Sequence, residues 1–175
     1  MKKKLLLMLS VAAFVVCLLA ISVSAATEID GIYYELSGSG ENAIAKVTAD
    51  NATLCSLENV VIPENVTYEG VSYTVTTINS HAFSGSQSNW GKNQTIKTLV
   101  IPKTVTSIGA HILRECKSIT SVTVKSMSAT FNDAEFYNCT NLKTVDMSES
   151  GVTKFGQYCF YGCSNLTTVE YPATL

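Results

Sequence analysis

Cysteine and histidine are the residue types in this 175-residue chain that could most readily do chemistry. Of the six cysteines, one lies in an apolar N-terminal run, and the others are Cys55, Cys116, Cys139, Cys159 and Cys163. A nucleophilic cysteine must be partly exposed and oriented by a base, and a metal site needs several converging ligands. The cysteines lack Cys-x-x-Cys spacing, and the only histidines, His81 and His111, each follow an isoleucine by three residues. We interpret both histidines as neighbouring turn residues, and we predict no metal site and no cofactor.

Three of the cysteines, Cys116, Cys139 and Cys163, occupy the same place in a repeat. Stacked repeats would direct these thiols inward and in parallel, an arrangement that does not meet the torsion of a disulfide. Although an exported protein invites disulfides, a small buried hydrophobe is the better account of this ladder. We therefore predict buried free thiols there, and the state of Cys55 and Cys159 stays open. The chain also lacks a Gly-rich phosphate loop and a nucleophile elbow, so we predict that it is not an enzyme and has no catalytic residues.

The N-terminal 25 residues have the features of a signal peptide. Lys2, Lys3 and Lys4 form a positive start, residues 5–21 are almost wholly apolar, and Val23-Ser24-Ala25 offers small residues for cleavage. The alternative is an uncleaved anchor, because the apolar run approaches spanning length. We expect a secreted or cell-surface protein with no membrane span in its mature form.

Charge argues against a nucleic acid or an anionic membrane as the partner. The formal net charge is −2, and removal of Lys2, Lys3 and Lys4 leaves nine basic residues against fourteen acidic ones. An acidic body without a basic stripe repels a phosphate backbone. We therefore expect no nucleic-acid partner.

The elements that position these residues form an internal repeat. Copies begin at Ile96, Ile119, Leu142 and Leu166, with 23, 23 and 24 residues between starts, and an earlier copy stretched by insertions begins near Val60. Each copy has a short period-2 alternation, typical of a half-buried strand, and then apolar anchors that suit a tight turn or a single helical turn. One copy cannot bury its apolar face alone, so neighbours must stack. The pattern predicts a mostly-β repeat solenoid of short parallel strands.

The repeat also resembles the leucine-rich repeats of BspA-like surface proteins. Residues 96–116 read close to Leu-x-x-Val-x-Ile-Pro-x-x-Val-x-x-Ile-Gly-x-x-Ala-Phe-x-x-Cys, and Ala82-Phe83 and the Phe160-to-Cys163 segment match its later elements. Val124-Lys125 and Met147-Ser148 depart from it, because both lack the Ile-Pro. The resemblance covers roughly residues 30–175. It implies a leucine-rich-repeat fold and adhesion to extracellular matrix proteins or to other cells.

Three segments follow from this pattern: a signal peptide at 1–25, an N-terminal β cap at 26–59, and leucine-rich repeats at 60–175, about four plus a partial last one. In the cap, strands at 32–36 and 43–48 would form a β-hairpin that covers the first repeat. The other end has no cap, so either its last strand is exposed or the array continues. An uncapped parallel edge is an association hazard, and we expect some self-association there.

Candidate binding residues lie on the strand positions that point away from the core. One column holds Val61, Val100, Thr123, Asp146 and Glu170; a second holds Thr98, Ser121, Thr144 and Thr168; Lys97 and Lys143 flank them. This hydroxyl-rich face turns acidic toward the C-terminus and could hydrogen-bond an extracellular protein or a glycan. A plain soluble face is the alternative, because threonine is a good strand former.

A second candidate is the insertion between Phe83 and Ile96, which holds Trp90, the only tryptophan of the chain. Long polar loops often carry function, and an exposed tryptophan can anchor a protein or a sugar ring. The alternative is that Trp90 folds back onto the repeat. Together these features predict a secreted or cell-surface adhesion module. The alternative is a non-catalytic accessory or spacer domain of a larger surface protein, one that could bind glycans.

Overall fold

The computed structural model describes residues 26–49, 55–85, 91–128 and 130–173. The described elements are eleven strands and one short 3-10 helix. In chain order they are β1 Thr27–Ile29, β2 Ile32–Ser37, η1 Gly40–Asn42, β3 Ile44–Thr48, β4 Asn59–Val61, β5 Asn65–Tyr68, β6 Val71–Ile78, β7 Thr98–Ile101, β8 Ser107–Ile108, β9 Ser121–Val124, β10 Thr144–Asp146 and β11 Thr168–Glu170. The prediction of a mostly-β repeat is confirmed. Within the described ranges, no helix is long and apolar enough to cross a membrane.

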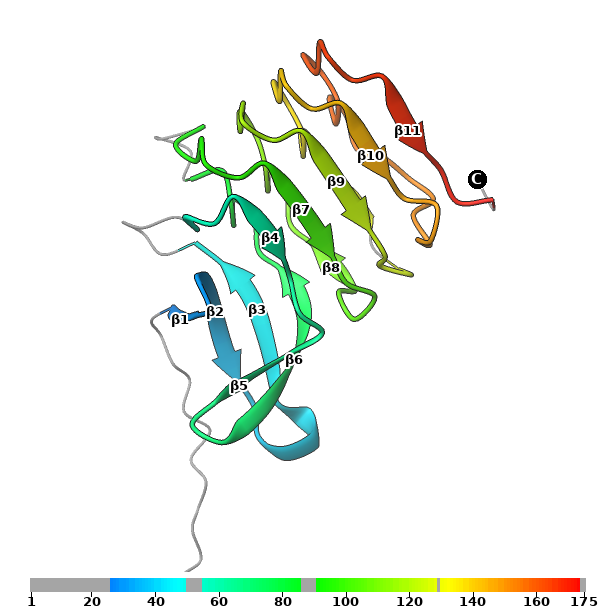
Figure 1. Cartoon of the computed structure of the whole chain (residues 1–175). Coiled ribbons are helices and arrows are strands. Elements are labelled where there is room, and N and C mark those ends of the chain that lie inside the picture. The colour runs from blue at the N-terminus through cyan, green and yellow to red at the C-terminus, as the bar shows by residue number, and fades with distance from the viewer. Residues whose placement is uncertain (1–25, 50–54, 86–90, 129, 174–175) are drawn as a thin grey trace, which may run out of the picture.

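Five of the strands form a parallel sheet with one strand from each repeat. Its order is β11-β10-β9-β7-β4, and the strands lie side by side as a staircase in Figure 1. The central residue of each strand points inward: Val60, Leu99, Val122 and Val145 are fully buried, and Val169 in the last strand is partly buried. The residues on either side point outward, as the period-2 alternation predicts.

The N-terminal strands form a second sheet, in the order β1-β2-β3-β6-β5. As predicted, β2 and β3 pair antiparallel, with Tyr34 opposite Val47. Strand β6 then pairs in parallel with β3 on one side and with β8 on the other. Because β8 follows β7 in the same repeat, β6 links this sheet to the repeats.

Turns return the chain in each repeat and make a second set of contacts between neighbours. The amide of Phe83 donates to the carbonyl of Ile112 at 3.1 Å, and the amide of Phe136 donates to the carbonyl of Cys159 at 2.9 Å. Behind these bonds, the rings of Phe136 and Phe160 stack with centroids 5.3 Å apart. Stacked repeats are therefore joined along the sheet, through the core and along the turns.

Close approach of neighbouring turns accounts for the glycine of the Ile-Gly element. The amide of Gly109 donates to the carbonyl of Ile78 at 2.7 Å. A Cβ at position 109 would collide with the backbone nitrogen and the hydroxyl of Ser80. Glycine therefore allows these two segments of backbone to approach each other closely.

Candidate functional site

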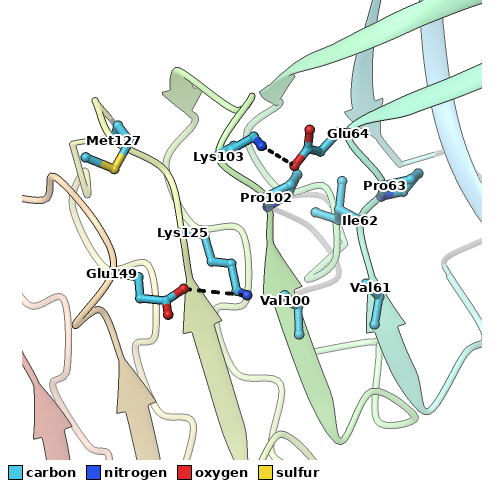
Figure 2. Close-up of a pocket in the computed structure, with 10 residues that line it drawn as sticks. All are labelled: Val61, Ile62, Pro63, Glu64, Val100, Pro102, Lys103, Lys125, Met127 and Glu149. Atoms are coloured by element: carbon cyan, nitrogen blue, oxygen red, sulfur yellow. Dashed lines mark ion pairs between the residues drawn. The ribbon is translucent and has the colours of Figure 1, made fainter.

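An open groove lies at the carboxyl ends of β4, β7 and β9 (Figure 2). Its volume is about 440 Å³. The residues that line it are Val61, Ile62, Pro63, Glu64, Val100, Pro102, Lys103, Lys125, Met127 and Glu149. They come from four successive repeats, so the groove exists only because the repeats stack.

The floor and walls of the groove are apolar. Val61 is 63% exposed and Met127 is 64% exposed, although both are large hydrophobic side chains. Figure 2 shows Val61 and Val100 side by side on adjacent strands, with Met127 on the segment after β9. Exposed apolar side chains that line one groove are candidate contacts for a partner.

Proline explains why the groove opens where it does. Pro63 and Pro102 follow β4 and β7, and a proline has no amide hydrogen with which to continue a ladder. In the next repeat the equivalent residue is Lys125, whose amide does continue the ladder by donating to the carbonyl of Ile101 at 2.9 Å. The strands therefore end unevenly, and the loops beyond them leave a hollow.

Two ion pairs cross the rim. Lys103 Nζ lies 3.2 Å from Glu64 Oε1, and Lys125 Nζ lies 3.6 Å from Glu149 Oε2. All four side chains are substantially exposed, and exposed pairs of this kind contribute at most about 1 kcal/mol. A partner can therefore replace one member of either pair at little cost.

The outward side chains of the parallel sheet lie in register across the strands. Val61 pairs with Val100, Val100 with Thr123, Thr123 with Asp146, and Asp146 with Glu170. We call these five residues the cross-strand row. Its character changes steadily along the array, from two valines through a threonine to two carboxylates.

The carboxylate of Asp146 is held in place by Ser148. Both the amide and the hydroxyl of Ser148 donate to Asp146 Oδ1, at 2.9 and 2.7 Å. These hydrogen bonds, with a smaller contribution from the charge of Lys125, lower the pKa of Asp146. The carboxylate is therefore ionised at neutral pH and presents its other oxygen on the outward face.

The predicted site residues fall into separate places on this face. Thr98, Thr123 and Asp146 are half-buried, whereas Thr144, Thr168 and Glu170 are exposed. Thr98 donates its hydroxyl hydrogen to Asn59 Oδ1 at 2.9 Å. Lys97 lies at the amino ends of the strands and pairs with Glu58 at 2.8 Å, so it stands at the opposite strand ends from the groove.

Trp90 lies outside the described residues, but the residues after it are anchored. Gly91 packs against Glu115, and Gln94 donates to the carbonyl of Glu115 at 3.0 Å. The side chain of Asn93 is buried and donates to the carbonyl of Cys55 at 2.8 Å. The end of the insertion is thus fixed near the turns at Glu115.

Sequence reasoning missed most of the groove. Lys103, Lys125, Met127 and Glu149 were not among the candidates, because they follow the strands and do not belong to them. The available signal was the departure from Ile-Pro at Val124-Lys125. It marks the repeat in which the backbone after the strand differs from that of the two earlier copies.

The cysteines and histidines lie away from this face. Cys116 and Cys139 are fully buried and Cys163 is half-buried, so the predicted inward ladder is confirmed. The rings of His81 and His111 stack with centroids 5.4 Å apart, which confirms that they are neighbours. In the described part of the chain, no group of three or more His, Cys, Asp or Glu side chains is placed to hold a metal ion.

A buried carboxyl group, Glu135, also lies among the turns. Its Oε2 accepts a hydrogen bond from the amide of Ile112 at 3.0 Å, and its Oε1 accepts one from the amide of Asn132 at 3.0 Å. The side chain is fully buried, and this burial raises the pKa of Glu135 to about 7 despite those hydrogen bonds. Glu135 therefore joins two turns through its carboxylate.

Comparison with known families identifies the repeat. The family model described as BspA type Leucine rich repeat region (6 copies) matches residues 87–175. That span is just over half of the 175 residues. No curated protein sequence matches the chain.

Three solved structures share the fold. A leucine-rich repeat protein from Bacteroides ovatus ATCC 8483 is 24% identical with a TM-score of 0.57, over 85% of this chain and 42% of that one. A leucine rich cell surface protein from Faecalibacterium prausnitzii A2-165 is 21% identical with a TM-score of 0.55, over 84% and 42%. A leucine-rich repeat protein from Bacteroides capillosus ATCC 29799 is 22% identical with a TM-score of 0.51, over 76% and 99%. The chain therefore spans less than half of two of these proteins and nearly all of the third.

Proposed function

Because this chain belongs to the BspA-type leucine-rich-repeat family, we propose that it is a secreted or cell-surface interaction module that binds extracellular matrix or other cell-surface proteins. Binding takes place on the outward face of the parallel sheet, at the groove and the cross-strand row. The module acts without catalysis.

The observation that carries this proposal is the exposed apolar surface of Val61 and Met127 in the groove. Burying one such side chain against a partner contributes about 1.5 to 3 kcal/mol relative to leaving it exposed. Both residues lie among stacked repeats, so their exposure does not depend on how the array ends. The similarity to a protein described as a cell surface protein supports the location.

The finer architecture belongs to the same proposal. The repeats form a continuous solenoid, and the antiparallel β2–β3 hairpin is its N-terminal cap. The parallel pairing of β6 with both β3 and β8 supports this view, because it joins the hairpin to the repeats through one strand. A cap of this kind keeps the apolar edge of the first repeat out of water.

The test is binding of the secreted chain to a panel of immobilised matrix proteins. Val61→Lys places a charge in the groove and should weaken binding at least tenfold. Thr67→Lys is the matched control, because it adds the same charge at an exposed strand position of the N-terminal sheet. Binding to the panel that survives Val61→Lys unchanged would overturn the proposal.

Trp90 is proposed as a second contact. The insertion that contains it returns to the repeat at Gly91, which packs beside Glu115. Trp90→Ala should weaken binding to the same matrix protein while leaving the urea midpoint of unfolding unchanged. Unchanged affinity for every partner of the panel would remove Trp90 from the site.

A second candidate function is an accessory or spacer domain of a larger surface protein that binds glycans. The observation that favours it is coverage, because the chain spans only 42% of two similar proteins. The exposed hydroxyls of Thr144 and Thr168 could hydrogen-bond sugars. A glycan array run beside the matrix panel separates the two functions: glycan binding without matrix binding favours the accessory domain.

A further inference from the structure

The cross-strand row has two chemically different ends. Val61 and Val100 form the apolar end beside the groove, and Asp146 and Glu170 form the acidic end. Strands of a sheet lie about 4.8 Å apart, so the five residues span about 19 Å. A ligand that follows the row meets apolar surface first and carboxylates last.

The acidic end has an excess of negative charge. Asp146 and Glu170 lie there, and among the described residues Lys125 is a cation close enough to lower the pKa of Asp146. Lys125 already lies 3.6 Å from Glu149, and Lys143 stands at the opposite, amino end of β10. Because Glu149 offsets the charge of Lys125, the carboxylates of Asp146 and Glu170 leave a net negative surface that attracts a cation.

The hydroxyls beside the row favour an extended ligand. Ser121, Thr144 and Thr168 lie next to Thr123, Asp146 and Glu170 on the same outward face, in register with one another. An extended segment carries free backbone amides and carbonyls that can bond to these hydroxyls. A helix satisfies those groups internally and cannot use them. At about 3.3 Å per residue, an extended segment of about six residues covers the row.

We infer that the row binds an extended segment of a partner protein, with apolar side chains at one end and lysine or arginine at the other. This inference rests on the proposed function and names the chemistry of its partner. The apolar side chains cover Val61 and Val100. The basic side chains pair with Asp146 and Glu170, where Ser148 already holds the carboxylate of Asp146 in position.

Fluorescence polarisation with synthetic peptides tests this inference. The first probe carries two leucines at one end and two lysines at the other, separated by serines and with blocked termini; the second has glutamates in place of the lysines. Each is made in both chain directions, because the row does not fix the polarity of the ligand. We expect one direction of the lysine probe to bind at least tenfold more tightly than its glutamate counterpart, and more weakly as salt is raised.

Variants identify the residues responsible. Asp146→Asn with Glu170→Gln should remove the preference for the lysine probe, whereas Glu41→Gln with Glu69→Gln removes two exposed charges elsewhere and should leave it intact. Val61→Thr keeps the branched shape of the strand residue and should weaken both probes about fivefold. Circular dichroism of each variant confirms that the fold is retained.

The outcomes separate this inference from the proposed function. Equal affinity for the lysine and glutamate probes, or no binding of either, overturns the inference. If Val61→Lys still abolishes binding to the matrix panel in that case, the proposed function stands alone. If Val61→Lys leaves binding to the matrix panel unchanged, the proposed function fails regardless of the peptide affinities.

Discussion

The thiol of Cys139 donates a hydrogen bond to the backbone carbonyl of Leu113, with 3.0 Å between sulfur and oxygen. Cys116 donates in the same way to the carbonyl of Phe83 at 3.5 Å, and Cys163 donates to that of Phe136 at 2.9 Å. Each thiol thus bonds to the preceding repeat. The ladder of cysteines is a chain of contacts between repeats, which explains why a small donor recurs at this core position.

Substitution of Cys139 should therefore lower stability in two ways, through the lost hydrogen bond and through the lost packing volume. We expect Cys139→Ala to lower the free energy of unfolding by about 1 to 2 kcal/mol, since it removes the donor and leaves a small cavity. Cys139→Ser retains a donor and should cost less than Cys139→Ala. Urea denaturation measures both; equal losses for the two variants would mean that the sulfur acts by packing alone.

Burial should also make the thiols unreactive in the folded protein. It raises the pKa of Cys116 to about 12 and that of Cys163 to about 11, and it raises the pKa of Cys139 well above its usual value. Near neutral pH these groups stay protonated and unreactive. In the chain without residues 1–25, titration with a thiol reagent should find almost no reactive cysteine in the native protein and five free cysteines after unfolding without reductant. Finding a single free thiol after unfolding would show that the other cysteines form disulfides.

Glu135 should make stability depend on pH. Its pKa is raised from 4.5 to about 7 in the folded state, first by burial and then by the nearby charge of Asp133. The folded state therefore binds the proton more tightly than the unfolded state. The stability from this group is fully present below pH 4.5 and is lost as pH rises through about 7. The loss amounts to about 3 kcal/mol.

Glu135→Gln isolates that effect, because glutamine does not ionise. The decrease in unfolding free energy between pH 5 and pH 8 should be smaller in this variant by about 2 kcal/mol. Asp133→Asn, at an exposed neighbouring residue, is the control and should retain most of the decrease. Parallel pH profiles for Glu135→Gln and the native sequence would contradict the assignment.

The last strand gives a prediction about association. Phe155, Phe160 and Leu166 are only partly buried there, and Tyr171 is half exposed with its ring edge against Phe155. A chain that lacks residues 1–25 and ends at Leu175 should self-associate through this edge. Sedimentation coefficients should rise with concentration, and Tyr171→Lys should reduce the rise while Tyr68→Lys, on β5 of the other sheet, does not. A monomer at every concentration would contradict the prediction.

Spacing along the sequence was enough to predict the strands of the repeats and their register. The starts at Ile96, Ile119 and Leu142 place Leu99, Val122 and Val145 in one buried line, which is how they pair. Such periodic information is local to each repeat and repeats itself, so errors at one copy are corrected by the others. The inward direction of the cysteine ladder follows from the same register.

The remaining features depend on contacts that occur once. Glu135 reads as a surface residue until the amides of Ile112 and Asn132 are seen to converge on its carboxylate. Met127 reads as a core residue, and only the course of the chain after β9 exposes it. The groove combines loops from four repeats, and no periodic sequence pattern specifies how close each loop lies to the next.

The register of the cross-strand row also has a consequence for how such a surface changes over generations. Each of its five side chains is an outward residue of a different repeat, and each lies next to an inward residue that packs in the core. One codon can therefore alter one contact with a partner while the interior stays as it was. A family built in this way can drift from one ligand to another through single substitutions, each of them tolerated by the fold.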